Sequence, residues 1–265
     1  MKFPRISIIT VVKNGMPYLS DSLKSFQLQN YLNKEHVVIY SKSQDNTEEF
    51  LKSQKKKIHI LKKDEKFNNK WDCLNRAIKL ATGEIIGILH ADDIFYNRNT
   101  LSYIAKNFLS NYEFVYGNIL FSKKNNILKI NRKWVSEEIN FSQLKYGWMA
   151  PHTSFFIKKK ILLNNKYINK YNISGDYYFM LNLFYKKYRY KYLNNFIAIM
   201  RSGGGSTQFK NIFEKFKEDV KITKLFFKHY YICVFFKIFR KIFQIINISK
   251  ELDINQYLIN FIKKK

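Results

Sequence analysis

Residues 80–93 read LATGEIIGILHADD, and this stretch predicts the fold of the chain. A helix over about 70–82 is expected to end at Gly83, because glycine suits the left-handed position that follows a helix. The apolar run 85–89 is expected to be a buried strand that leads almost directly into Asp92 and Asp93. Ligands bind at the carboxyl ends of strands in open α/β sheets, so this pair is a candidate site. Its oxygen ligands suit Mn²⁺ or Mg²⁺.

The residues before this stretch alternate short apolar runs with helical patterns, which indicates stacked βα units. Buried parallel strands are expected over 6–12, 36–40 and 58–61. Helices are expected over 18–29 and 46–55, the second capped by Asn46 and Thr47. Nearly continuous β-branched strands are typical of a sheet covered on both faces. The sequence therefore predicts an α/β domain with a mainly parallel sheet flanked by helices.

The part of the chain after Asp93 has a different pattern. Short strands are expected there without full-length helices between them, over 114–116, 119–121, 127–130 and 153–157. A helix over 175–186 follows, then strands over 190–193 and 197–200 and a glycine-rich loop at 202–206. This pattern predicts a mixed extension of the sheet. A change of composition near Gln208 divides the chain into residues 1–208 and 209–265.

Composition limits the possible functions. The 265 residues carry a formal net charge of +27, which favours polyanionic partners, although AT-rich coding bias would also enrich lysine. The chain has two cysteines far apart in sequence, which argues against a disulfide scaffold or a zinc site. The charge and the aromatic content leave a nucleic-acid-binding protein as an alternative, but the sequence contains no helix-turn-helix, zinc-finger or RNP-like signature, so we expect no nucleic-acid partner. No G-x-G-x-x-G follows the first strand, which disfavours a dinucleotide oxidoreductase.

Several segments, in collinear order from about residue 5 to 207, resemble those of family 2 glycosyltransferases, which have the GT-A fold. Residues 80–93 are similar to the family segment that begins A-T-G-(D/E) and ends in D-D. The other matching segments are IITVVKN at 8–14, SQDNT at 43–47, WDCLNRA at 71–77, MAPHTSFF at 149–156, ISGDYYFML at 173–181 and RSGGGS at 201–206. No single motif is decisive, but their order is specific.

The resemblance implies an inverting transferase that moves a sugar from a nucleotide-diphosphate sugar, a UDP-sugar above all, to a glycan or lipid-linked acceptor. A bacterial surface-polysaccharide or lipooligosaccharide pathway is the implied setting. Asp93 would bind Mn²⁺ or Mg²⁺, Asp92 would hold the ribose or share the metal, and Asp176 would be the general base. Taken alone, the pair could be a turn and Asp176 a carboxylate at a helix N-terminus.

The resemblance also implies a set of residues that bind the nucleotide-sugar. Tyr40 stands where relatives often carry an aspartate that contacts the base, which leaves the base open and makes a non-catalytic homologue conceivable. Asp64, or Glu65 in its place, is the acidic position after the third strand. Arg201 suits a diphosphate clamp, and His152 either contacts the ligands or is structural. The full set is Val12, Asn14, Tyr40, Asp45, Asp64, Asp72, Asn75, Arg76, Asp92, His152 and Arg201.

The segment after Gln208 alternates large aromatic residues with lysine and arginine. Lys237, Arg240 and Lys241 share one helix face, and the charges interrupt the apolar run too often for a comfortable membrane span. The pattern predicts an amphipathic helix on an anionic membrane, at the cytoplasmic face of the inner membrane. The alternative is a helix packed on the catalytic domain. In that alternative the aromatic residues that complete the core are Phe226, Phe235, Phe239 and Phe243.

Overall fold

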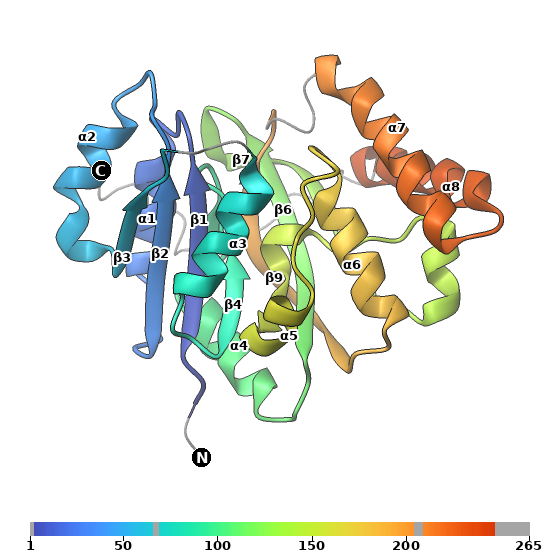
Figure 1. Cartoon of the computed structure of the whole chain (residues 1–265), viewed down its shortest axis with the longest axis horizontal. Coiled ribbons are helices and arrows are strands. Elements are labelled where there is room, and N and C mark those ends of the chain that lie inside the picture. The colour runs from blue at the N-terminus through green and yellow to red at the C-terminus, as the bar shows by residue number, and fades with distance from the viewer. Residues whose placement is uncertain (1–2, 66–68, 204–208, 247–265) are drawn as a thin grey trace.

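The structure is a computed structural model that describes residues 3–65, 69–203 and 209–246. Its described strands form one sheet in the order β3-β2-β1-β4-β8-β6-β9-β5, with β7 paired to β6 (Figure 1). The first four strands are parallel to one another, as the apolar runs predict. Their bounds are Ile6–Val12 for β1, Lys34–Tyr40 for β2, Ile60–Lys63 for β3 and Ile85–Ile88 for β4.

The rest of the sheet is mixed, as expected, but its strands are longer than the sequence suggested. The expected strands 114–116 and 119–121 are one strand, because β6 continues through Gly117 with a shift of register against β9. The strands expected at 190–193 and 197–200 are likewise joined in β9. The bounds are Ile94–Phe95 for β5, Phe114–Lys123 for β6, Asn126–Trp134 for β7, Phe156–Lys158 for β8 and Tyr190–Arg201 for β9.

Helices cover both faces of the sheet. On one face α3, α5 and α6 pack against β1, β2 and β4, and on the other face α1 and α4 do so. Figure 1 shows α3 and α6 in front of the sheet. The bounds are Leu19–Gln27 for α1, Thr47–Ser53 for α2, Lys70–Leu80 for α3, Thr100–Phe108 for α4, Lys159–Asn164 for α5, Gly175–Tyr185 for α6, Phe209–Phe226 for α7 and Tyr230–Ile246 for α8. Short 3₁₀ turns lie at Lys55–Lys57 (η1), Phe141–Tyr146 (η2) and His152–Ser154 (η3).

One helix was not predicted from the sequence. It is α4, which lies before the strands expected over 114–157, and its buried residues Leu101, Ile104, Ala105 and Phe108 have helical spacing that could have revealed it. The strand expected at 153–157 begins only at Phe156, because His152–Ser154 forms the 3₁₀ turn η3.

Gly83 is not the left-handed residue after α3, because the helix ends at Leu80 and Ala81 is its C-cap. Its lack of a side chain serves close packing instead. A Cβ on Gly83 would lie 2.3 Å from Ser7 Oγ, to which its N–H donates a hydrogen bond. Asn46 begins α2 without a side-chain cap, and Asp45 Oδ1 accepts from the Thr47 N–H instead.

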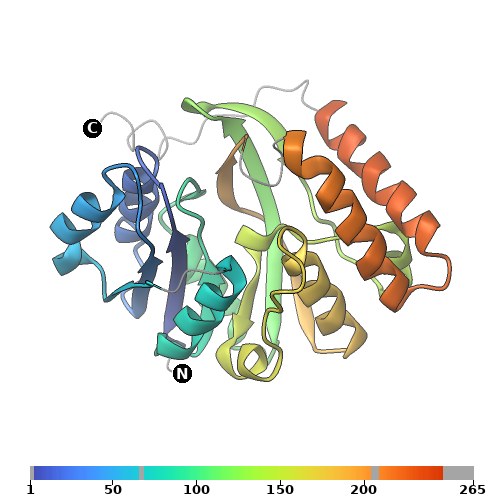
Figure 2. The ribbon, with the colours of Figure 1, turned by 45° about the horizontal axis from the view of Figure 1, so that its top comes forward.

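The helices α7 and α8 lie side by side as a hairpin against α6 and η2 (Figure 2). Ile222 and Cys233 are buried, and Phe226 packs against the main core, whereas Phe235 and Phe239 are exposed. The side chain of Phe243 lies outside the described part. None of the described helices is both long and apolar enough to cross a membrane. That residues 209–265 form a separate unit stays a prediction, and these contacts tie α7 and α8 to the rest of the chain.

Candidate active site

A cavity of about 1140 Å³ opens at the carboxyl ends of β1 and β4. One end is lined by the loop after β1 and the residues after β4, and the other end by the start of α6 together with α7 and α8. We call the first the donor end and the second the base end. The predicted site residues that line this cavity are Val12, Asn14, Asp92, His152, Asp176 and Arg201.

The adjacent carboxylates Asp92 and Asp93 lie in different environments. Asp92 lines the cavity, whereas Asp93 is only 1% exposed and accepts a hydrogen bond from Thr153 Oγ1 at 2.9 Å. Burial, and after it the charge of Asp92, raises the pKa of Asp93 well above its usual value. Direct metal binding by Asp93 stays a prediction, and its buried position favours Asp92 for that role.

The residues at the donor end fit a divalent cation that shares its ligands with a nucleotide. Among residues 3–65, 69–203 and 209–246, no group of three or more His, Cys, Asp or Glu side chains could hold a metal ion without help. Mg²⁺ typically takes one or two carboxylates and completes its shell with phosphate oxygens and water. One accessible carboxylate, Asp92, at the mouth of a cavity matches that pattern.

Arg201 fixes the backbone of the donor end. This arginine is at the end of β9 and largely buried, and its Nη1 donates to the carbonyl of Asp92 at 2.9 Å. Its Nη2 is paired with Asp21 Oδ2 at 2.6 Å, and its guanidinium lies 4.7 Å from the centre of the Tyr18 ring. In this structure Arg201 therefore connects α1 to the residues after β4. Its expected role as a diphosphate clamp stays a prediction.

Asp176 lies in the first turn of α6, at the base end of the cavity. Burial alone would raise the pKa of its carboxyl, but the neighbouring charges of His152, Lys215, Lys70 and Lys237 outweigh burial and hold that pKa below its usual value. Asp176 is therefore ionised at neutral pH and can accept a proton.

His152 is a buried, neutral neighbour of this carboxylate. Burial lowers its pKa to about 3, and its Nε2 lies 2.9 Å from the hydroxyl of Tyr167. Near pH 7 the imidazole of His152 is therefore uncharged. The structure thus favours a positioning or binding role for His152 over proton transfer.

Six predicted binding residues are not among the described residues that line the cavity. They are Tyr40, Asp45, Asp64, Asp72, Asn75 and Arg76. Two of them join segments that follow strand ends. Asp45 accepts from the Met16 N–H at 2.9 Å, which joins the loops after β1 and β2. Asp64 is ion-paired with Arg76 and accepts a hydrogen bond from Cys73 Sγ at 3.1 Å, which joins the end of β3 to α3.

The others pack or bond within the fold. Tyr40 is buried in the cluster that contains Leu51. Asn75 exchanges two hydrogen bonds with the backbone of Tyr167, at 2.7 and 3.1 Å. Asp72 accepts from Asn169 Nδ2 at 3.2 Å. Nucleotide contacts by these residues remain predictions.

Sequence reasoning missed several residues of the cavity wall. Trp148 follows a left-handed glycine, and Lys215 and Lys237 come from α7 and α8. Lys237 was noticed only as part of a basic helix face. Trp71 belonged to a matched segment and could have been singled out there. The two lysines carried no local signal, because only long-range packing brings their helices to the cavity.

The fold and this cavity define a glycosyltransferase of the GT-A type. Residues 7–172 match the glycosyl transferase family 2 profile, and the chain belongs to that family. An uncharacterised glycosyltransferase of Methanocaldococcus jannaschii is 26% identical over 213 residues, which are 76% of this chain and 72% of that protein. The GalNAc(5)-diNAcBac-PP-undecaprenol beta-1,3-glucosyltransferase of Campylobacter jejuni is 26% identical over 193 residues, which are 69% of this chain and 61% of that protein.

Solved structures share the fold at low sequence identity. The S. aureus TarS 1–349 complex with UDP-GlcNAc has a TM-score of 0.65 and 16% identity, and the match covers 98% of this chain and 80% of that one. The mannosyltransferase PcManGT of Pyrobaculum calidifontis, in complex with GDP-Man and Mn²⁺, has a TM-score of 0.63 and 18% identity. The match covers 84% of this chain and 64% of that one. These structures confirm the expected GT-A fold.

Proposed function

We propose that this glycosyltransferase works with inversion, transferring a sugar from a nucleotide-diphosphate sugar to an acceptor hydroxyl. The observation that supports this most is one cavity with an accessible carboxylate, Asp92, at the donor end and an ionised carboxylate, Asp176, at the base end. Separate carboxylates for the leaving group and for the nucleophile are what a single displacement requires.

The residues of the chain divide the reaction between them. Val12 and Asn14, at the end of β1, bind the nucleotide, and Asp92 holds Mn²⁺ or Mg²⁺. When bound, the metal neutralises charge on the departing diphosphate. Asp176 takes the proton of the acceptor hydroxyl while the oxygen of that hydroxyl bonds to the anomeric carbon. The bond from that carbon to the diphosphate breaks, and the nucleoside diphosphate leaves with the electron pair.

We propose a UDP-sugar donor and a glycan or lipid-linked acceptor in bacterial surface-polysaccharide or lipooligosaccharide synthesis. TarS binds UDP-GlcNAc and PcManGT binds GDP-Man, which supports a nucleotide-sugar donor. The name of the Campylobacter relative specifies an undecaprenol-diphosphate acceptor, which supports the lipid-linked class.

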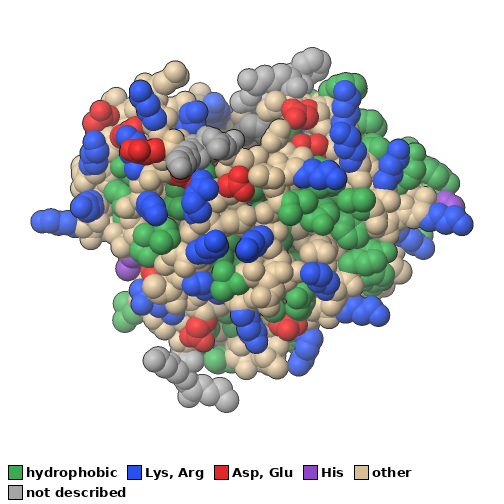
Figure 3. Space-filling view, viewed as in Figure 1, with side chains coloured by type: hydrophobic (Ala, Val, Ile, Leu, Met, Phe, Trp, Pro, Cys, Tyr) green, Lys and Arg blue, Asp and Glu red, His purple; other side chains and the backbone are tan. Residues whose placement is uncertain are grey.

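We also propose that α7 and α8 bind the anionic cytoplasmic face of the membrane. Phe213 is 66% exposed and Phe235 is 62% exposed, and Lys217 Nζ lies 4.3 Å from the centre of the Phe213 ring. Figure 3 shows hydrophobic side chains interleaved with Lys and Arg in the right-hand part of the molecule, where Figure 1 places these helices. Apolar rings with flanking cations favour an anionic lipid surface over a neutral one.

The transferase proposal is tested by thermal shift and product release. UDP-GlcNAc, UDP-glucose, UDP-galactose and GDP-mannose are each added with Mn²⁺, because a ligand bound only by the folded state raises the midpoint of unfolding. The donor that stabilises the protein is expected to release its nucleoside diphosphate slowly by hydrolysis. Absence of both stabilisation and release for every donor would contradict the proposal.

The membrane proposal is tested by sedimentation with vesicles. The protein is expected to sediment with phosphatidylcholine–phosphatidylglycerol vesicles and not with phosphatidylcholine alone, and salt should weaken binding. A Phe213→Ser, Phe235→Ser double variant should lose this binding. Leu32→Ser, which changes an exposed apolar residue before β2, is the control. Wild-type protein that ignores anionic vesicles at low salt would refute the proposal.

A further inference from the structure

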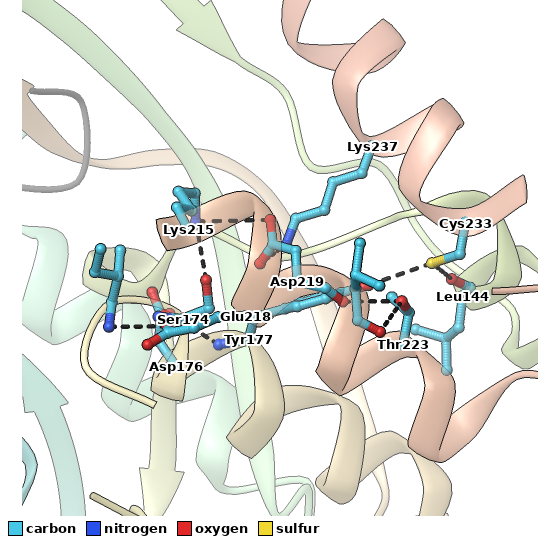
Figure 4. Close-up of polar contacts among 12 residues, drawn as sticks. Leu144, Ser174, Asp176, Tyr177, Lys215, Glu218, Asp219, Thr223, Cys233 and Lys237 are labelled. Carbon is cyan, nitrogen blue, oxygen red and sulfur yellow. Dashed lines mark hydrogen bonds and ion pairs between the residues drawn. The ribbon is translucent and has the colours of Figure 1, made fainter. Parts of the chain in front are cut away.

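A carboxylate on α7 binds the backbone that leads into the helix of Asp176. Glu218 Oε1 accepts from the N–H of Asn172 at 2.7 Å, and its Oε2 accepts from Ile173 at 3.0 Å and from Ser174 at 2.7 Å. The Glu218 residue is only 7% exposed. Figure 4 shows this glutamate beside Ser174 and Asp176. A single buried side chain therefore accepts hydrogen bonds from three consecutive backbone N–H groups.

These donors belong to the N-terminal end of α6. Ser174 is the N-cap of that helix, and its own side chain makes no capping hydrogen bond. Free N–H groups and the helix dipole make a helix N-terminus favourable for a negative charge. Glu218 supplies that charge from another helix, and Asp176 follows the N-cap by two residues. Asn172 and Ile173 themselves line the cavity.

Other contacts of α7 and α8 hold the same turn. Lys215 Nζ donates to Ser174 Oγ at 3.4 Å. Asp219 pairs with Lys237 at 2.8 Å, and Lys237 Nζ lies 3.2 Å from the centre of the Tyr177 ring. Residues on both sides of Asp176 in sequence are thus contacted by the C-terminal helices (Figure 4).

We propose that Glu218 is a positioning residue that sets the placement of Asp176 through the backbone of residues 172–174. This inference rests on the proposed role of Asp176 as the base. Hydrogen bonds to a carboxylate are stronger than neutral ones, and their loss leaves the buried N–H of Ser174 without its partner. The helix start would then shift, and small misplacements of a reacting group lower the rate steeply. Glu218 lies beyond residues 7–172, the part that matches the family profile.

The test compares Glu218→Gln with Glu214→Gln, a change of an exposed glutamate one turn earlier on α7. Glutamine keeps the size of the side chain but replaces one acceptor oxygen with an NH₂ donor, so it cannot accept all three bonds. Glu218→Gln is expected to lower kcat about 10–100-fold, the scale of a misplaced reacting group. The donor KM, and the affinity for the nucleoside diphosphate with Mn²⁺, should stay unchanged. Glu214→Gln should have the kcat, donor KM and nucleotide affinity of wild type.

A double-variant cycle separates positioning from general stability. If Glu218 acts through Asp176, Glu218→Gln adds little further loss of kcat in an Asp176→Asn background. Full additivity, or a wild-type kcat for folded Glu218→Gln, would overturn the inference. Glu218→Asp keeps the charge but shortens the reach, so its kcat should lie between those of wild type and Glu218→Gln. This variant takes the place of Glu218→Gln if the glutamine variant does not fold. A wild-type protein that binds nucleotide but transfers no sugar would instead refute the proposed function itself.

Discussion

The two ends of the cavity are built in different ways. The donor end consists of residues next to the strand ends of β1 and β4, which the parallel sheet brings together. At the base end, the turn that precedes Asp176 is held by Glu218, which is 44 to 46 residues away along the chain. The donor end therefore follows from local motifs, whereas the base end depends on how α7 and α8 pack.

The largest effect is expected when α7 and α8 are removed. A chain that ends at Gln208 would expose the core around α6 and lose the Glu218 bonds, because Ile222 and Thr223 are buried against the domain. We expect it to lose transfer completely and to unfold at a lower temperature, measured by product formation and by thermal melting. Undiminished transfer would instead show that residues 1–208 are an independent catalytic unit.

Asp176→Asn tests the base end alone. The amide cannot take the acceptor proton, so kcat should fall by roughly 10²–10⁴-fold, the usual contribution of a positioned base. Nucleotide affinity, measured by calorimetry, should stay near wild type because the donor end is intact. In the wild type, the pKa of Asp176 is below its usual value, so kcat should not fall until the pH becomes acidic. A folded variant with near-normal kcat would place the base elsewhere.

Asp92→Asn and Asp93→Asn test the donor end. Asp92 lines the cavity and Asp93 does not, so only the first change should remove the gain in nucleoside-diphosphate affinity that Mn²⁺ provides. We expect a loss of about tenfold, or ~1.4 kcal/mol, by calorimetry. The same titration in EDTA gives the metal-free reference. Equal losses for both variants would mean that Asp93 also reaches the metal.

A further expected effect is a pH dependence of stability from His36, a buried residue of β2. Burial, and after it the charge of His59, lowers the pKa of His36 from 6.5 to about 3, and its Nε2 bonds Thr10 Oγ1 at 2.9 Å. A base with a depressed pKa stabilises the fold above its unfolded pKa and loses that stability as the pH falls. Protonation of His36 alone should therefore lower the free energy of unfolding by about 1.4 kcal/mol per pH unit between pH ~6.5 and about 3.

Denaturant unfolding at several pH values measures this slope. A His36→Gln variant should have a smaller slope than wild type, whereas His229→Gln, a change of an exposed histidine, should leave the slope unchanged. An unchanged slope in the His36 variant would assign the pH dependence to other groups, the buried His152 at the base end first among them.

The sequence by itself determined the family, the parallel core and the position of the carboxylate pair. Continuous apolar runs such as Ile6–Val12 fit a strand covered on both faces, and the end of such a strand is where ligands bind. The family match over residues 7–172 confirms the family and covers the quoted segments from 8–14 to 149–156, whereas the segments at 173–181 and 201–206 lie beyond it. These features are local, since each depends on residues adjacent in the chain.

Only the tertiary structure decided what depends on distant contacts. Gly117 looked like the end of a strand, yet β6 continues past it because β9 accommodates the shift of register. Asp92 and Asp93 are adjacent in sequence, and only the fold buries the second, whose carboxylate accepts a hydrogen bond from Thr153. Glu218 looked like one charge in a basic segment. Its three hydrogen bonds exist because α7 folds back onto α6, and no local pattern encodes that approach.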